Sequence, residues 1–202
     1  TDRGAIRYDG KTFRSFFYSP GAPNHITNNF ALQILEDHVG NIWIITEYGL
    51  NRLNVNGSIN HYLHDPQKSN SINSNWIHFI YQDSSNRIWV GTNKGLNLYQ
   101  AQTDSFLRIE GKLKDSLNNI AVFQMLEIDN DNFMLGSLEG IAFFKPSEQG
   151  FVLESDINAN IPSWYNSTIY EMTLSKSGRF LIGTDSQGLI EFNPLTKEFK
   201  QY

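Results

Sequence analysis

The chain has 202 residues, with 16 Lys and Arg, 21 Asp and Glu, and no Cys. This length fits one or two domains and is sufficient to bury a core. A formal net charge of −5 without a long basic run argues against nucleic acid as the principal ligand. The lack of Cys excludes disulfide frameworks, Cys-ligated zinc and thiol nucleophiles, and no apolar run approaches the roughly 18 residues that suggest a membrane span.

Many short strands are expected from the composition. Turn-forming Asn and Gly are frequent, and aromatic residues make up 13% of the chain. No stretch of a dozen residues keeps the apolar period of 3.6 that an amphipathic helix requires. These features predict an all-β fold, whose first two strands are expected at Ala5–Tyr8 and Thr12–Tyr18.

The next stretch separates into four strands joined by turns. Asp37 stands where its side chain closes the first turn, and Gly49 suits the left-handed conformation that a short hairpin link often needs. The expected strands are Phe30–Glu36, Ile42–Thr46, Leu50–Leu53 and Ile59–Leu63.

The middle of this stretch recurs along the chain. Residues 40–53, GNIWIITEYGLNRL, match residues 86–99, NRIWVGTNKGLNLY, and weaker copies span 132–143 and 178–192. The glycines at positions 4, 49, 95, 140 and 188 are separated by 45, 46, 45 and 48 residues. Four short strands in each period are typical of a β-propeller blade.

The period therefore predicts a β-propeller segment with about four complete four-stranded antiparallel blades and a leading half-blade, all part of a larger propeller. Within the segment 1–202, the half-blade is expected at 1–20 and the blades at approximately 26–65, 72–110, 118–154 and 166–202. The large residues that should fill the space between blades, at equivalent buried positions, are Trp43, Trp89, Met134 and Leu181.

These copies resemble the two-component regulator propeller repeat. In that family each blade reads approximately as Asp, a turn, Gly-Asn-Ile-Trp-Ile-Gly-Thr, two variable residues and Gly-Leu-Asn-Arg-Leu. The resemblance is close at Asp37–Leu53 and Asp83–Tyr99, and weaker at Asp129–Phe143 and Ser175–Phe192, which lack the Trp. The signatures of WD, kelch and sialidase propellers do not fit.

The resemblance implies the ligand-sensing segment of an extracytoplasmic propeller in a hybrid two-component system. It implies an oligosaccharide ligand, a periplasmic location, and a parent chain anchored in the inner membrane. The implied partners are the remaining blades and the kinase module of the same polypeptide, through which a histidine kinase and a phosphorelay would drive transcription. No direct nucleic-acid contact by this segment is expected, and homodimerisation is left open.

One loop face is organised as a recognition surface. The links between second and third strands vary while their flanks repeat, and they share a face with the long connections into the next blade. Polar side chains there would bond sugar hydroxyls and aromatic rings would stack on sugars, against the alternatives of a solvated rim and, for the Trp, packing. The candidate ligand-binding residues are Glu47, Tyr48, Asn93, Lys94, Glu139, Asp185, Gln187, Trp164 and Tyr165.

Signals of catalysis and metal binding are weak. His61 and His64 are three apart on an expected strand, so they would point to opposite faces. The run 129–132, DNDN, lacks the downstream Glu of a calcium loop, and no phosphate loop, His-Glu-x-x-His motif or nucleophile elbow occurs. No catalytic residue, metal or cofactor is therefore predicted.

Two other functions remain open. A propeller enzyme resembling a polysaccharide lyase would need an acid–base pair that converges from several blades, and no blade supplies an obvious one. A protein-interaction scaffold would need a contiguous apolar patch on one face.

Overall fold

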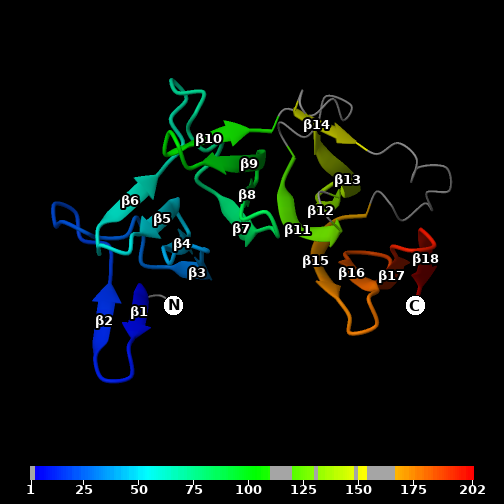
Figure 1. Cartoon of the computed structure of the whole chain (residues 1–202), viewed down its shortest axis with the longest axis horizontal. Coiled ribbons are helices and arrows are strands. Elements are labelled where there is room, and N and C mark those ends of the chain that lie inside the picture. The colour runs from blue at the N-terminus through cyan, green and yellow to red at the C-terminus, as the bar shows by residue number, and fades with distance from the viewer. Residues whose placement is uncertain (1–2, 110–119, 130–131, 148–149, 154–166) are drawn as a thin grey trace. The chain divides into compact units, whose positions relative to one another are not determined.

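The computed structural model describes residues 3–109, 120–129, 132–147, 150–153 and 167–202, and the elements found among them are all strands. The all-β prediction is therefore confirmed. The strands, labelled in Figure 1, are β1 (Ala5–Tyr8), β2 (Phe13–Phe16), β3 (Ala31–Glu36), β4 (Ile42–Thr46), β5 (Leu50–Leu53), β6 (Ile59–Tyr62), β7 (Ile77–Gln82), β8 (Ile88–Thr92), β9 (Gly95–Gln100), β10 (Ser105–Arg108), β11 (Val122–Asp129), β12 (Asn132–Ser137), β13 (Gly140–Ser147), β14 (Gly150–Leu153), β15 (Ile169–Leu174), β16 (Phe180–Thr184), β17 (Leu189–Asn193) and β18 (Glu198–Gln201).

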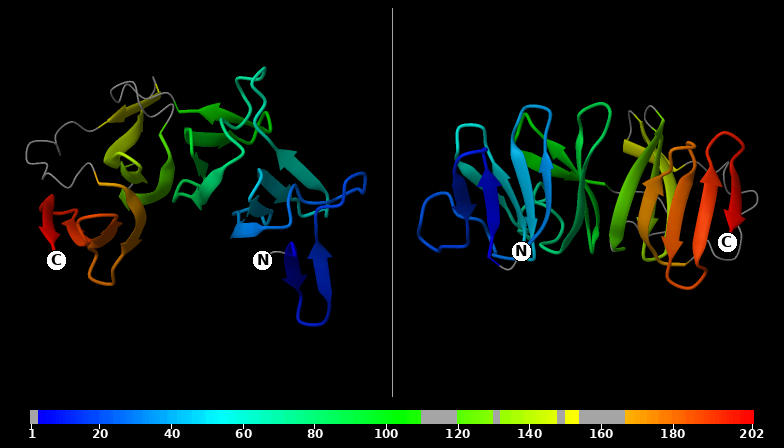
Figure 2. Two further views of the ribbon diagram at one scale, coloured as in Figure 1. Left: turned by 180° about the vertical axis from the view of Figure 1, so that it is seen from behind. Right: turned by 90° about the horizontal axis from the view of Figure 1, so that it is seen from below.

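The strands form antiparallel meanders of the kind that make propeller blades. Within the described residues, β1 and β2 form a hairpin, and four-stranded sheets follow as β3–β6, β7–β10, β11–β14 and β15–β18. Figure 2 shows the same meanders from two further sides. This is the expected β-propeller segment, with four complete blades and a leading half-blade.

The chain divides into two compact units. The first comprises Thr1–Thr92 and Asn97–Arg108, and it holds β1–β2, the β3–β6 sheet and most of the β7–β10 sheet. The second comprises Asn93–Leu96 and Ile109–Tyr202, and it holds the β11–β14 and β15–β18 sheets. Each unit has a hydrophobic cluster of its own between two of its sheets.

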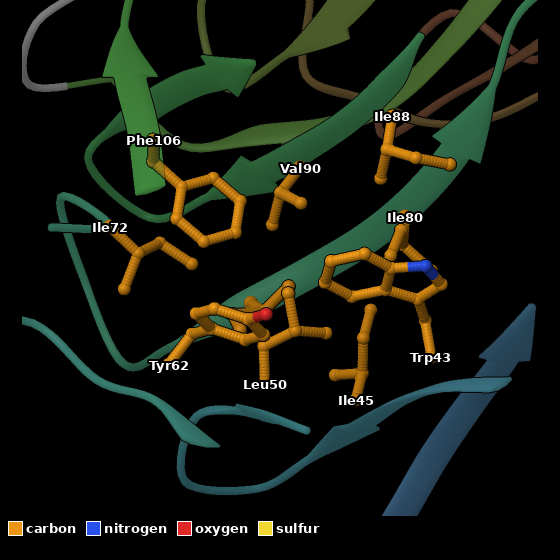
Figure 3. Close-up of a cluster of buried hydrophobic side chains, with 10 residues drawn as sticks. Trp43, Ile45, Leu50, Tyr62, Ile72, Ile80, Ile88, Val90 and Phe106 are labelled. Atoms are coloured by element: carbon orange, nitrogen blue, oxygen red, sulfur yellow. The ribbon is translucent and has the colours of Figure 1, made fainter. Parts of the chain in front are cut away.

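The main core of the first unit lies between two sheets. Side chains alternate across a strand, so Trp43 and Ile45 of β4 point to the same side. Figure 3 shows them with Tyr62 facing Val90 and Phe106 of the next sheet. The Trp43 indole is fully buried there, which confirms its expected place between blades.

The position of Trp43 recurs in every complete sheet, but its burial does not. Trp89 of β8 and Met134 of β12 are fully buried, whereas Leu181 of β16 is half-buried. Trp43 and Met134 each pack against the sheet that follows in the chain. Among the described residues no sheet follows β15–β18. The expectation of complete burial at all four positions is therefore wrong at Leu181.

In the first strong repeat, the turn between first and second strands is closed by a buried carboxylate. Asp37 Oδ1 accepts the N–H groups of Val39 and Asn41 at 3.1 and 2.8 Å. Its Oδ2 accepts Asn41 Nδ2 at 3.0 Å and Trp43 Nε1 at 2.9 Å. The carboxylate therefore supplies the partner that a buried indole N–H requires.

The second strong repeat has the same arrangement, and the weak repeats lack it. Asp83 accepts Trp89 Nε1 at 2.8 Å and is almost fully buried. In the third sheet, where Met replaces Trp, Asp129 is exposed. In the fourth, Ser175 stands at this position and its Oγ accepts the Arg179 N–H at 3.1 Å.

Gly91 of β8 leaves space for an aromatic ring on the neighbouring strand. Its register partner on β7 is Phe79, and a Cβ added to Gly91 would lie 1.8 Å from a carbon of that ring. At the matching position on β16, the nearest atom to a Cβ added to Gly183 is the Glu171 carbonyl oxygen, at 3.7 Å.

We expect Gly91→Ala to lower the free energy of unfolding by about 1–3 kcal/mol, because the new methyl group overpacks the site against Phe79. Gly183→Ala is the matched control and should cause no loss. Urea denaturation followed by tryptophan fluorescence measures both. A second change, Phe79→Leu, should recover part of the loss in the Gly91→Ala background, and equal losses in the two glycine variants would contradict the steric explanation.

Candidate functional site

The links between second and third strands are tight hairpins with a repeated hydrogen-bonding framework. Thr46 Oγ1 donates to the Gly49 carbonyl oxygen at 3.2 Å, and the equivalent hydroxyls of the third and fourth sheets make the same bond at 2.9 Å. Gly49 and Gly95 have φ of 92° and 112°, which confirms the expected left-handed conformation. The residues between hydroxyl and glycine are therefore presented on a fixed scaffold.

These links lie beside the connections between sheets. The Glu47 N–H donates to the Phe30 carbonyl oxygen at 2.9 Å, just before β3. The Gly49 N–H donates to the Asn75 carbonyl oxygen at 2.9 Å, in the connection toward β7. In the fourth sheet, the Asp185 N–H donates in the same way to the Thr168 carbonyl oxygen, just before β15, at 3.1 Å. Links and connections therefore share one edge of their sheets.

The candidate residues on the links fall in both units. Glu47 and Tyr48 belong to the first unit, and the others that the structure describes belong to the second. Trp164 and Tyr165 lie outside the described residues. Asn93 and Gln187 are half-buried, and Asn93 Oδ1 has no hydrogen-bond partner in the described part of the chain. The exposed candidates are Glu47, Tyr48, Lys94, Glu139 and Asp185, and none of the described candidates lines the grooves described next.

The first unit has a groove of about 670 Å³ at the edge opposite its links. In an antiparallel meander the turns alternate between the two edges, so the first and third turns of a sheet lie together. The groove is lined by the β3–β4, β7–β8 and β9–β10 turns, together with Arg52 of β5 and Tyr99 of β9. We call it the turn groove.

A cluster of charged and aromatic side chains borders the turn groove. Arg52 forms an ion pair with Asp104 at 3.0 Å and donates to the Tyr99 hydroxyl. Its guanidinium lies 5.4 Å from the ring centroids of Trp43 and Tyr99. The hydroxyls of Tyr62 and Tyr99 donate to Asp104 Oδ1 at 2.5 and 2.7 Å. The cluster thus joins β5 and β6 to the β9–β10 turn of the next sheet.

Electrostatics fix the protonation states of this cluster. Burial raises the pKa of Tyr62 and of Tyr99, and their hydrogen bonds to Asp104 add to the rise. Burial also raises the pKa of Asp104, but hydrogen bonds from both tyrosines and the charge of Arg52 outweigh it and leave that pKa below its usual value. The cluster at neutral pH therefore pairs an ionised Asp104 with Arg52 and two neutral tyrosines.

Two smaller grooves lie elsewhere. One of about 320 Å³ runs between the β1–β2 hairpin and the β3–β6 sheet, with Phe16 and Ile34 in its lining. The other, of about 410 Å³, lies on the fourth sheet and includes Arg179 and Glu191, which pair at 3.1 Å. Among the described residues, no three His, Asp or Glu side chains are grouped to hold a metal ion, and no helix could cross a membrane.

Sequence reasoning missed the turn groove and one histidine contact. His61 lies against His25, with ring centroids 4.7 Å apart, and its Nε2 is 2.5 Å from the His25 carbonyl oxygen. Most of the groove residues sit on turns that vary between repeats, as the links do, and others, such as Arg52 and Tyr99, sit on strands. Sequence variation is therefore found at both edges of the sheets and does not show which edge has a groove, because that depends on side-chain packing.

Comparison with known proteins identifies the repeat. Residues 71–94 match the model of the two component regulator propeller family. The chain contains a two-component regulator propeller repeat. The matched segment includes β7, the Asp83 turn and Trp89, which are parts of the second strong copy. No curated protein sequence matches the chain significantly.

Solved structures share the fold. The extracellular domain assigned to the hybrid two component system BT3049 of B. thetaiotaomicron superposes with a TM-score of 0.78 at 22% identity, over 99% of this chain and 27% of that one. The extracellular domain of BT4673, from the same organism, gives 0.72 at 19% identity, over 100% of this chain and 25% of that one. The chain therefore spans about a quarter of these domains.

An enzyme shares the fold as well. Virginiamycin B lyase from Staphylococcus aureus superposes with a TM-score of 0.62 at 13% identity, over 96% of this chain and 60% of that one. The fold alone thus does not separate sensors from enzymes. The match of residues 71–94 is the more specific finding.

Acid should weaken the cluster beside the turn groove. The pKa of Asp104 is lower in the folded state than in the unfolded state. The ionised carboxylate therefore stabilises the fold at pH values above its unfolded-state pKa, and this stabilisation is lost as the pH falls through its folded-state pKa. We expect Asp104→Asn, which suits the φ of 49° at this position, to lower the free energy of unfolding by about 1 kcal/mol at pH 7. The difference from the parent should shrink below about pH 4.

Chemical denaturation at pH 7 and pH 3 measures this effect, with Asp185→Asn, an exposed acid outside the cluster, as the control. A loss for Asp104→Asn that is the same at both pH values would show that the ionised carboxylate is not its source.

Proposed function

We propose that this chain is a ligand-sensing segment of the extracytoplasmic propeller of a hybrid two-component system, and that it detects oligosaccharides. The observation that carries the proposal is the two-component regulator propeller repeat at residues 71–94. The fold that the chain shares with extracellular domains assigned to such systems supports it. The parent chain would be anchored in the inner membrane, with this segment in the periplasm and a histidine kinase beyond the membrane.

The link residues are proposed to select the ligand. Glu47 and Asp185 are exposed on hairpins that are held by a hydroxyl–carbonyl bond, so their polar groups can meet sugar hydroxyls at little ordering cost. Lys94 is exposed on the equivalent link of the second sheet. Tyr48, half exposed on the same link as Glu47, offers a flat apolar surface with a polar tip. The other proposed residues are Asn93, Glu139, Gln187, Trp164 and Tyr165.

Calorimetric titration of the natural polypeptide with neutral oligosaccharides (cellohexaose, xylohexaose, mannohexaose) and acidic ones (trigalacturonate, a chondroitin sulfate disaccharide) tests the sensing function. For any oligosaccharide that binds, Glu47→Ala and Lys94→Ala should each lower the affinity about three- to tenfold, as the loss of one or two hydrogen bonds predicts. Val55→Ala, on an exposed turn at the opposite edge, is the control. If none of the five sugars binds, the proposal that this protein senses them is wrong.

We also propose that further strands complete the β1–β2 hairpin. Among the described residues β1 pairs with β2 alone, whereas its equivalents β5, β9, β13 and β17 each have a strand on both sides. Large apolar side chains of the hairpin remain exposed, with 56% of Ile6, 58% of Tyr8 and 73% of Phe13 accessible. The groove beside the hairpin is lined largely by apolar residues of the β3–β6 sheet. These residues would pack against the two missing inner strands of the hairpin's blade.

Hydrogen–deuterium exchange tests this completion. The amides of residues 5–8 that do not bond to β2 should exchange at least tenfold more slowly in the natural polypeptide than in the 202-residue chain, because a neighbouring strand would accept them. The amides of β4, which is paired on both sides, serve as the internal reference. Equal exchange at residues 5–8 in both proteins would mean that no strand is added at this edge.

A further inference from the structure

We propose that the turn groove of the first unit is a binding site for a neutral oligosaccharide, separate from the links. The proposal rests on the sensing function proposed above and names a second surface for it. The volume of about 670 Å³ falls within the range of small-molecule sites. Every described residue that lines it belongs to the first unit.

The charges that line the turn groove are balanced. Among the described lining residues they are two Arg and two Asp, and each has a partner inside the first unit. Arg52 pairs with Asp104 at 3.0 Å, and Arg87 pairs with the buried Asp83 at 2.6 Å. Asp37 is held by N–H donors that include the Trp43 indole. A ligand with its own charge would have to break one of the two ion pairs or displace the N–H donors of Asp37, so the groove favours an uncharged ligand.

Planar amides provide the hydrogen-bonding capacity that remains. The side chains of Asn86, Gln100 and Gln102 line the groove, and none of the three forms a hydrogen bond within the described part of the chain. Each amide offers two donors and an acceptor, which is the combination that vicinal hydroxyls of a sugar can satisfy. The amides come from two turns and a strand end, so they border the groove on more than one side.

The apolar side of the groove is held in place before any ligand arrives. The Tyr99 ring lines the groove, and its hydroxyl donates to Asp104 at 2.7 Å. The ring also lies 4.9 Å from the buried Trp43 indole and 5.5 Å from Phe106. A ring fixed in this way can contact the apolar face of a sugar without losing further side-chain freedom.

A peptide fits this site less well than a glycan does. Extended peptides gain affinity by adding a strand to a sheet edge, and helical ones by filling an apolar groove. The turn groove is formed largely by turn side chains, and its polar groups are amides and paired charges. Its chemistry therefore matches hydroxyl groups better than a peptide backbone.

The test uses the natural polypeptide and the same five sugars, with a tryptic digest of casein as the peptide probe. The double variant Asn86→Gly/Gln102→Ala removes two amides, and glycine suits the φ of 63° at position 86. We expect this double variant to lower the affinity for a neutral hexaose about tenfold. Gln67→Ala, which removes an exposed glutamine from the connection at the other edge, is the matched control and should change nothing.

A charge variant makes the second arm of the test. Gln102→Lys adds a positive charge to a balanced groove, so it should create or raise affinity for trigalacturonate at least fivefold. If a sugar binds and neither groove variant alters its binding, the site is wrong while the sensing function stands. Peptide binding that Asn86→Gly/Gln102→Ala weakens would assign the groove to peptides instead. Failure of every sugar to bind would overturn both proposals.

Discussion

The buried indole of Trp43 imposes two requirements that the rest of the first unit meets. Its ring must be covered by the next sheet, and its N–H must find an acceptor away from water. Asp37 provides the acceptor at 2.9 Å and closes the β3–β4 turn with its other oxygen. The cover comes from side chains of β7, β8 and β10. Packing between sheets and the geometry of a turn are thus coupled through one carboxylate.

Side-chain hydrogen bonds also join the first strands of neighbouring sheets. The Gln33 side chain bonds to both backbone groups of Ile80, with its Nε2 on the carbonyl oxygen and its Oε1 on the N–H, each at 3.1 Å. Gln124 on β11 makes half of this arrangement, because its Oε1 accepts the Met172 N–H of β15 while its Nε2 donates to Glu171 Oε1 at 3.0 Å. The register places Phe79 at the corresponding position of β7, where its ring takes the space left by Gly91. One strand position thus serves either hydrogen bonding between sheets or packing within a sheet.

The sequence period was enough to predict the meanders and the glycine conformations, because both depend on residues close together in the chain. β4 and β5 begin and end where the sequence analysis placed them. The partial exposure of Leu181 could not be foreseen, since it depends on a neighbouring sheet and not on its own repeat. The Arg52–Asp104 pair, which spans two blades, left no signal in either repeat alone. The candidate link residues follow from sequence variation, and their role in binding stays a prediction.

The register explains why the turn groove belongs to the first unit. Arg52 pairs in register with Trp43, and Glu191 occupies the same position opposite Leu181 on the fourth sheet. Arg52 reaches Asp104 on the next sheet, but Glu191 bonds to Arg179 within its own sheet, at 3.1 Å. An arginine at this position can therefore connect two sheets and support a groove between them, whereas the Glu191–Arg179 pair stays within a single sheet. Repeats with a shared backbone thus acquire different surfaces through one charged position.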